Sequence, residues 1–113
     1  MAKTDTCELI PTSAELEEII RTKDRLFVLF YASWCPFSRM FLPVYVEHAE
    51  SSDPCYRRIL VDTDDDLIEK YKIEVYPTVL FFQQGRLVRR LDGTYHVGLN
   101  KNQLTDFVVR CPS

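Results

Sequence analysis

The order of apolar and polar positions divides the chain into alternating strands and helices. Residues 26–31 are apolar without alternation, which is typical of a strand covered on both faces of a sheet. Residues 13–20 carry apolar side chains at helical spacing after a Thr12-Ser13 cap. The same analysis predicts strands at 7–10, 26–31, 58–62, 79–82 and 86–91, and helices that begin near 13, 35, 63 and 103.

The predicted order of elements is β-α-β-α-β-α-β-β-α. This order indicates an α/β fold with a central mixed sheet flanked by helices. A chain of 113 residues is long enough for one core and too short for two, so we expect a single domain spanning 1–113. Its composition, 46% hydrophobic and 12% aromatic, is that of a globular protein rather than a disordered one.

Charge and hydropathy exclude some classes of partner. The net charge is −3 and the basic residues are scattered, so the sequence shows no nucleic-acid-binding segment. The first twenty residues contain no apolar stretch of signal-peptide length, and no run is long enough to span a bilayer. We therefore expect a cytoplasmic protein without a membrane partner, with an exported form that has lost a leader as the open alternative.

Cys35 is the candidate reactive residue. It lies between the apolar strand and a segment of helical period that contains Pro43. At the start of a helix, free backbone N–H groups and the positive end of the helix dipole favour the thiolate over the thiol. The Cys35 sulfur is therefore expected to act as a nucleophile.

Several landmarks around this cysteine together resemble the thioredoxin family. They are Trp34-Cys35-x-x-Ser38 after the buried strand, the helix proline Pro43, Tyr76-Pro77-Thr78, a Gly85 hairpin and Gly93 after the last strand. The resemblance implies a thioredoxin fold and makes Cys35 the attacking thiol. It aligns Pro77 with the cis-proline that presents backbone groups to an extended substrate peptide, places Trp34 and Tyr76 along that groove, and makes Gly93 the glycine that keeps the groove open.

Three residues depart from the thioredoxin pattern. Ser38 replaces the second cysteine, which normally resolves the mixed disulfide, and Leu29 replaces the buried acid that serves that cysteine. Pro36 follows the nucleophile, as in glutaredoxins, whereas thioredoxins have glycine there. A fourth position keeps its basic character, since Arg58 falls where thioredoxins carry a lysine near the site. Cys35 would thus act as a lone thiol, and its mixed disulfide would persist until an external thiol attacks it.

Within the motif, Cys35 and Ser38 are the expected catalytic residues. The thiolate is expected to accept hydrogen bonds from the N–H groups of Phe37 and Ser38, with the Ser38 hydroxyl as a further donor. Phe37 is expected in an exposed turn, either contacting the substrate peptide or packing on the helix. The expected substrate-binding residues are Trp34, Pro36, Phe37, Tyr76, Pro77 and Gly93.

The other cysteines and the histidines have simpler expected roles. Because the family topology sets the first strand beside the third, Cys7 and Cys55 could form a disulfide, and the alternative is two free thiols. Cys111 is expected on the solvent side of the C-terminal tail, and His48 and His96 at the surface. Met40, Phe41, Tyr45, Phe81 and Phe82 are expected in the core.

Neither a metal nor a resident cofactor is expected. Asp62, Asp64, Asp65 and Asp66 follow a strand and begin a helix, where acids complement the helix dipole without any metal. No spacing of Cys and His resembles a zinc site. Glutathione or another small thiol would enter as a co-substrate only.

Three functions remain open from the sequence. The first is a monomeric monothiol thiol–disulfide oxidoreductase acting on protein disulfides or glutathionylated cysteines. The second is a thioredoxin-fold module that binds client proteins without turnover, as Cys-x-x-Ser members of the protein disulfide isomerase family imply. The third is a glutathione-dependent iron–sulfur carrier, suggested by the similarity of Cys-Pro-Phe-Ser to the Cys-Gly-Phe-Ser of monothiol glutaredoxins.

Overall fold

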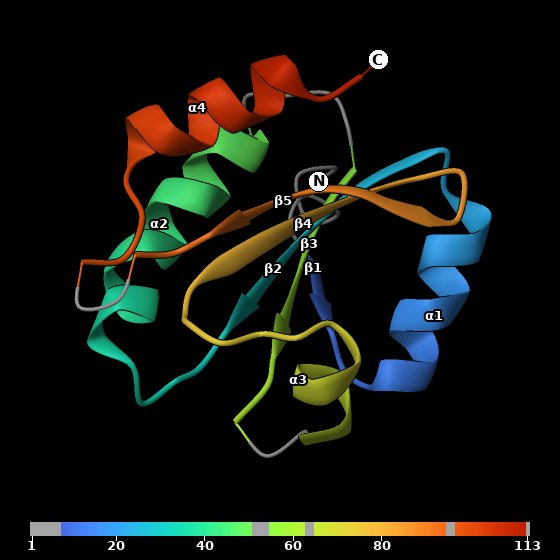
Figure 1. Ribbon diagram of the computed structural model, residues 1–113, viewed down its shortest axis with the longest axis horizontal. Helices are drawn as coiled ribbons and strands as arrows, with labels where there is room; N and C mark the ends of the chain where they lie inside the picture. The colour runs from blue at the N-terminus through green and yellow to red at the C-terminus, as the bar shows by residue number, and fades with distance from the viewer. Residues whose placement is uncertain (1–7, 51–54, 63–64, 95–96, 113) are drawn as a thin grey trace.

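A five-stranded mixed sheet forms the centre of the molecule (Figure 1). The structure is a computed structural model, and it describes residues 8–50, 55–62, 65–94 and 97–112. The elements are β1 (Glu8–Ile10), α1 (Ser13–Thr22), β2 (Arg25–Tyr31), α2 (Pro36–Glu50), β3 (Cys55–Leu60), α3 (Asp65–Lys70), β4 (Thr78–Gln83), β5 (Arg86–Asp92) and α4 (Lys101–Arg110). The predicted order of elements is confirmed.

The strands lie in the order β1-β3-β2-β4-β5. β1 and β2 both pair with β3 in parallel, whereas β4 pairs with β2 and β5 in antiparallel fashion. The sheet is therefore mixed, as expected, and β2 lies at its centre. Since Cys35 follows the end of β2, the candidate nucleophile lies at the carboxyl end of the central strand.

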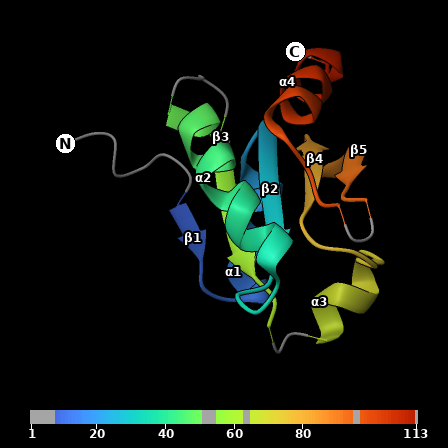
Figure 2. The same ribbon diagram turned by 90° about the vertical axis from the view of Figure 1, so that its left-hand side faces the viewer.

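The two faces of the sheet carry two separate apolar clusters, covered by different pairs of helices (Figures 1 and 2). Phe27, Leu29 and Tyr31 of β2 face α2 and α4, whose core residues include Phe41, Tyr45, Leu104 and Phe107. Val28 and Phe30 face α1 and α3, where Leu16, Ile20 and Leu67 are buried. Residues 26–30 are all fully buried, which explains why the run lacks polar alternation.

Local signals set several boundaries. Thr12 caps α1 by accepting a hydrogen bond from the N–H of Glu15 at 3.2 Å. Asn100, rather than Asn102, caps α4 and forms a reciprocal capping box with Gln103. The turn before β5 has positive φ at Gln84 and Gly85, as the hairpin prediction requires.

Some predicted boundaries were wrong. The strand expected at 58–62 begins at Cys55 and ends at Leu60, because its pairing with β2 runs from Leu26 opposite Cys55 to Tyr31 opposite Leu60. The last helix begins at Lys101 instead of residue 103. Strand pairing and capping therefore set these ends, rather than the apolar run alone.

Three side-chain assignments also needed correction. Met40 is 71% exposed and is not a core residue. Cys111 is buried beside the aromatic cluster under α4 and is not on the solvent side. His48 is half-buried, and its Nε2 lies 3.0 Å from the hydroxyl of Tyr56. His96 and Cys7 lie outside the described residues, as does the side chain of Cys55, so their expected roles stay predictions.

Candidate active site

The turn between β2 and α2 holds Cys35 at the first turn of a helix. The N–H of Cys35 donates to the carbonyl of Ala32 at 3.2 Å, and the Cys35 carbonyl accepts from the N–H of Arg39 at 3.1 Å. Pro36 is the first residue of α2, where a missing backbone N–H leaves no helical bond unmade. Pro36 therefore helps to fix the point at which α2 begins, directly after Cys35, which is 6% exposed.

Ser38 is fully buried and binds the preceding turn. Its Oγ accepts a hydrogen bond from the N–H of Ala32 at 3.2 Å. The hydrogen bond of the Cys35 thiol goes to the carbonyl oxygen of Tyr76, 3.9 Å from Sγ. The hydrogen bonds expected from Phe37 and Ser38 concern the thiolate and stay a prediction. Ser38 thus closes the turn that carries the nucleophile.

A shallow hollow opens beside the sulfur. It has a volume of about 270 Å³ and is lined by Trp34, Cys35, Pro36, Phe37, Glu74, Val75 and Tyr76. Its two walls come from the start of α2 and from the segment between α3 and β4. The hollow is smaller than most sites for drug-sized ligands, so it suits one or two side chains of a bound peptide.

Aromatic residues bridge the two walls of this hollow. The rings of Trp34 and Tyr76 meet edge to face with their centroids 5.5 Å apart, and Trp34 is 61% exposed. An exposed tryptophan held by a second ring offers a large apolar surface at little cost in side-chain entropy. The structure therefore brings together expected groove residues from two distant parts of the chain.

Phe37 is half-buried in the first turn of α2 and not in an exposed turn, and its contact with a substrate peptide stays a prediction. It lines the hollow, and it also packs against Gly98, where an added Cβ would lie 3.0 Å from the Cβ of Phe37. Sequence reasoning missed Gly98, which has a φ of +86°. A glycine two residues before a helix cap was the only signal for it.

The Tyr76–Pro77 peptide bond is cis, and Gly93 lies directly against it. A Cβ at Gly93 would lie 2.6 Å from the carbonyl oxygen of Pro77, a separation that real Cβ atoms do not tolerate. Only glycine therefore permits this approach of β5 to the segment before β4.

Comparisons with known proteins agree with this geometry. The Thioredoxin family model matches residues 8–110, nearly the whole chain. The chain belongs to the thioredoxin family. Its fold is the thioredoxin fold, as the resemblance implied.

Relatives of two kinds resemble this thioredoxin-family chain. The chain is 30% identical to thioredoxin of Mycoplasmoides gallisepticum, over 88% of its own length and 96% of that protein. It is also 30% identical to endoplasmic reticulum resident protein 44 of Bos taurus, where the match covers 75% of this chain and only 23% of the longer protein. Among solved structures, Plasmodium falciparum thioredoxin superposes on this chain with a TM-score of 0.81 at 24% identity. The superposition covers 93% of this chain and 99% of the other.

The thioredoxin pattern is altered beneath the site. Leu29 is fully buried where the family's acid was expected, and it lies opposite Arg58 in the β2–β3 pairing. Arg58 donates to the hydroxyl of Tyr31 at 2.6 Å, and its guanidinium lies 5.9 Å from the centre of that ring. The basic residue thus contacts a phenol in this chain.

Asp62 is a supporting residue whose role the sequence did not reveal. Its Oδ1 accepts from the N–H of Ser33 at 2.7 Å, and its Oδ2 accepts from the Ser33 hydroxyl. The carboxylate therefore holds the turn before Trp34 and Cys35, whereas the sequence pattern predicts only that it complements the helix dipole. Among the described residues, no three His, Cys, Asp or Glu side chains cluster as metal ligands, and none of the helices there is long and apolar enough to cross a membrane.

Proposed function

We propose that this chain is a monothiol thiol–disulfide oxidoreductase. The Cys35 thiolate attacks one sulfur of a protein disulfide or of a glutathionylated cysteine. One S–S bond forms as another breaks, and the displaced sulfur leaves as a thiolate. A second thiolate, most simply glutathione, then attacks the mixed disulfide and releases Cys35. Each step exchanges one disulfide for another, so the site itself supplies no net electrons.

The replacement of the resolving cysteine by Ser38 carries this proposal. Ser38 is buried and its hydroxyl accepts the Ala32 N–H, so the position serves the turn instead of redox chemistry. The attack still has what it needs, namely a cysteine at the start of α2 and an open apolar hollow beside it.

The position of Cys111 supports a lone nucleophile. The carbonyl of the adjacent Pro112 accepts a hydrogen bond from Arg25 at 3.0 Å, which places Cys111 near the start of β2. Cys35 follows the end of that seven-residue strand, roughly 20 Å away. Cys55 also pairs with the start of β2, through Leu26. Neither residue can reach a mixed disulfide at Cys35 in the folded chain.

The residues around the hollow support proteins as the substrates. We propose that the chain acts on them as a monomer. Thioredoxin-like proteins act on disulfides of other proteins, and Trp34, Phe37 and Tyr76 offer contacts on either side of the sulfur. An extended peptide would lie across Pro77, whose approach to β5 depends on Gly93. We place the reaction in the cytoplasm, where reduced glutathione is the available thiol.

A variant with Cys35 as its only cysteine tests the proposal. Cys7, Cys55 and Cys111 are changed to serine, and the protein is incubated with oxidised glutathione while its mass is followed. We expect one glutathione adduct, released by added thiol, and many turnovers on a glutathionylated protein when reduced glutathione is present. C35S in the same background is the control. A Cys35 that forms no adduct would refute the enzyme assignment.

Client capture without turnover is the second candidate. The similarity to endoplasmic reticulum resident protein 44 and to protein disulfide-isomerase 1 of Caenorhabditis elegans favours it. In that case the adduct with a protein client would form, yet added glutathione would release it without sustaining repeated cycles. The number of turnovers per Cys35 therefore separates the two candidates.

A further inference from the structure

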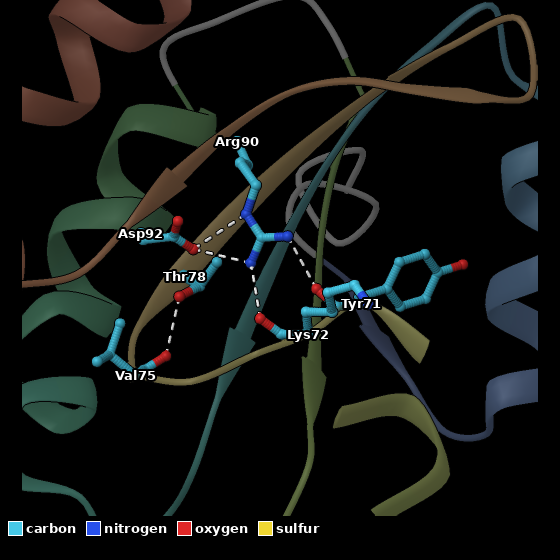
Figure 3. Close-up of polar contacts among 6 residues, drawn as sticks. All are labelled: Tyr71, Lys72, Val75, Thr78, Arg90 and Asp92. Carbon is cyan, nitrogen blue, oxygen red and sulfur yellow. Dashed lines mark hydrogen bonds and ion pairs between the residues drawn. The ribbon is translucent and has the colours of Figure 1, made fainter. Parts of the chain in front are cut away.

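The geometry points to Arg90 as a positioning residue for the substrate groove. From β5, its guanidinium clamps the backbone that ends α3 (Figure 3), and that backbone continues directly into the Glu74-Val75-Tyr76 wall of the hollow. The inference rests on the proposed function, because it assigns Arg90 a part in protein-substrate attack at Cys35.

The end of α3 leaves two carbonyl groups that need partners. The helix is short, and Lys72 turns the chain out of it with a φ of 52°. The N–H of Ile73 then bonds back to the carbonyl of Ile68 at 2.9 Å, as in a Schellman cap. The carbonyls of Tyr71 and Lys72 accept hydrogen bonds from another element of the fold.

Arg90 satisfies both carbonyls. Its Nη1 donates to the Tyr71 carbonyl at 2.8 Å and its Nη2 to the Lys72 carbonyl at 3.1 Å. Its Nε and Nη2 also donate to Oδ1 of Asp92, at 3.1 and 2.9 Å, which fixes the plane of the guanidinium (Figure 3). The rigid planar fork of an arginine holds two carbonyls and a carboxylate in one fixed arrangement, whereas the donors of a lysine all lie on one freely rotating nitrogen.

The clamp lies at one end of the groove wall, and contacts of β4 and of the residue after β5 lie at the other. Thr78 is buried and donates to the Val75 carbonyl at 2.9 Å (Figure 3). Gly93, just beyond Asp92, lies against the carbonyl of Pro77. The wall between these points carries the Tyr76 carbonyl that accepts from Cys35. Loss of the Arg90 fork should therefore loosen the backbone that faces the sulfur.

An isolated surface ion pair would not have this consequence. The Arg90–Asp92 pair alone is partly exposed, and such pairs contribute little to stability. The carbonyl contacts differ because they join residues 18 and 19 positions apart, on separate elements. Arg89, the next residue on β5, is exposed, so it serves as a control of equal charge.

The test compares two disulfide substrates in the background that keeps only Cys35. One is hydroxyethyl disulfide, which is too small to span the groove. The other is an eight-residue extended peptide whose single cysteine carries a cysteamine disulfide. We expect R90A to slow adduct formation with the peptide about tenfold, because it misplaces the groove backbone, and to leave the small disulfide within about twofold. R90K should recover part of the peptide rate, and R89A should match the parent. All rates are taken well below each variant's unfolding temperature.

Equal loss for both substrates, or for neither, would overturn the assignment of Arg90. Amide hydrogen exchange provides a readout that does not need the sulfur. R90A should speed exchange at Tyr71, Lys72 and Ile73, whose N–H groups bond to carbonyls of α3, while residues 26–31 keep the protection of the parent, and unchanged exchange at the three amides would also overturn it. If Cys35 of the parent reacts with neither substrate, the proposed function fails, and the exchange data alone decide on the clamp.

Discussion

A single methyl group at Gly93 is expected to displace the carbonyl of Pro77. The Cβ of an alanine would lie 2.6 Å from that oxygen, and ordinary van der Waals contact begins at 3.4 Å. The two atoms must therefore separate by about 0.8 Å, and both belong to backbone that cannot rotate away. The structure can respond only by moving β5, or the segment before β4, or both.

The expected energetic cost follows from comparable overpacking in protein cores. Inserting a methyl group into filled space typically costs about 1–3 kcal/mol. The unfolding entropy is about 2.1 cal/mol/K per residue, so the Tm of a chain of 113 residues falls by about 4 °C for each kcal/mol of unfolding free energy that is lost. G93A should therefore lower the Tm by about 4–12 °C. It should also slow peptide attack at Cys35, since the displaced carbonyl belongs to the residue directly after Tyr76, which lines the hollow.

G85A is the matched control. Gly85 has a φ of +83°, and no atom lies within 4 Å of the position that an alanine Cβ would take there. Its substitution therefore strains only the hairpin turn, by about 1 kcal/mol. Thermal unfolding and the peptide adduct rate are measured for both variants. A G93A protein with the Tm of the parent, and with an unchanged peptide rate, would refute the steric reasoning.

Three further predictions concern other buried groups. S38A leaves the buried N–H of Ala32 without its acceptor and should lower the free energy of urea unfolding by about 1–3 kcal/mol, whereas an unchanged value would mean that this hydrogen bond adds nothing. Burial lowers the pKa of His48, so the unfolded chain binds that proton more tightly than the folded chain does. The free energy of unfolding should therefore fall as the pH drops below about 6.5, and an H48Q variant with the same pH dependence would contradict this assignment. Burial raises the pKa of the Cys111 thiol, so this thiol should react slowly in the folded protein. In a variant that keeps Cys111 as its only cysteine, Ellman's reagent should modify it slowly without denaturant and rapidly in urea. Fast modification of the folded variant would contradict the burial of Cys111.

Local signals made much of the fold predictable. Residues 26–31 had to be a strand buried on both faces, because nothing polar interrupts them. Thr12 and Asn100 marked helix starts because a side-chain oxygen near free N–H groups acts within one turn of chain. The position of Cys35 between strand and helix followed from the same short-range pattern.

The helical spacing of apolar residues alone did not reveal which face of a helix is buried. Met40 and Phe41 are neighbours of similar hydrophobicity, yet one is 71% exposed and the other 1%. The apolar stripe of α2 is wide enough to allow either assignment, and packing against the sheet decided between them. Cys111 was misassigned for a similar reason, since the packing of α4 on the sheet buries its end.

The sequence by itself determined the elements, their order and the position of Cys35 between a strand and a helix, because these depend on interactions within a few positions of the chain. The tertiary structure alone decided which distant residues support the site. Asp62 holds Ser33 across 29 positions, and Arg90 reaches the Tyr71 and Lys72 carbonyls from another strand. A surface arginine or aspartate has the same local pattern whether or not it has a partner, because the partner is selected by strand order and register. Strand order and register therefore assemble the groove beside Cys35, whereas the local sequence alone sets the position of the cysteine.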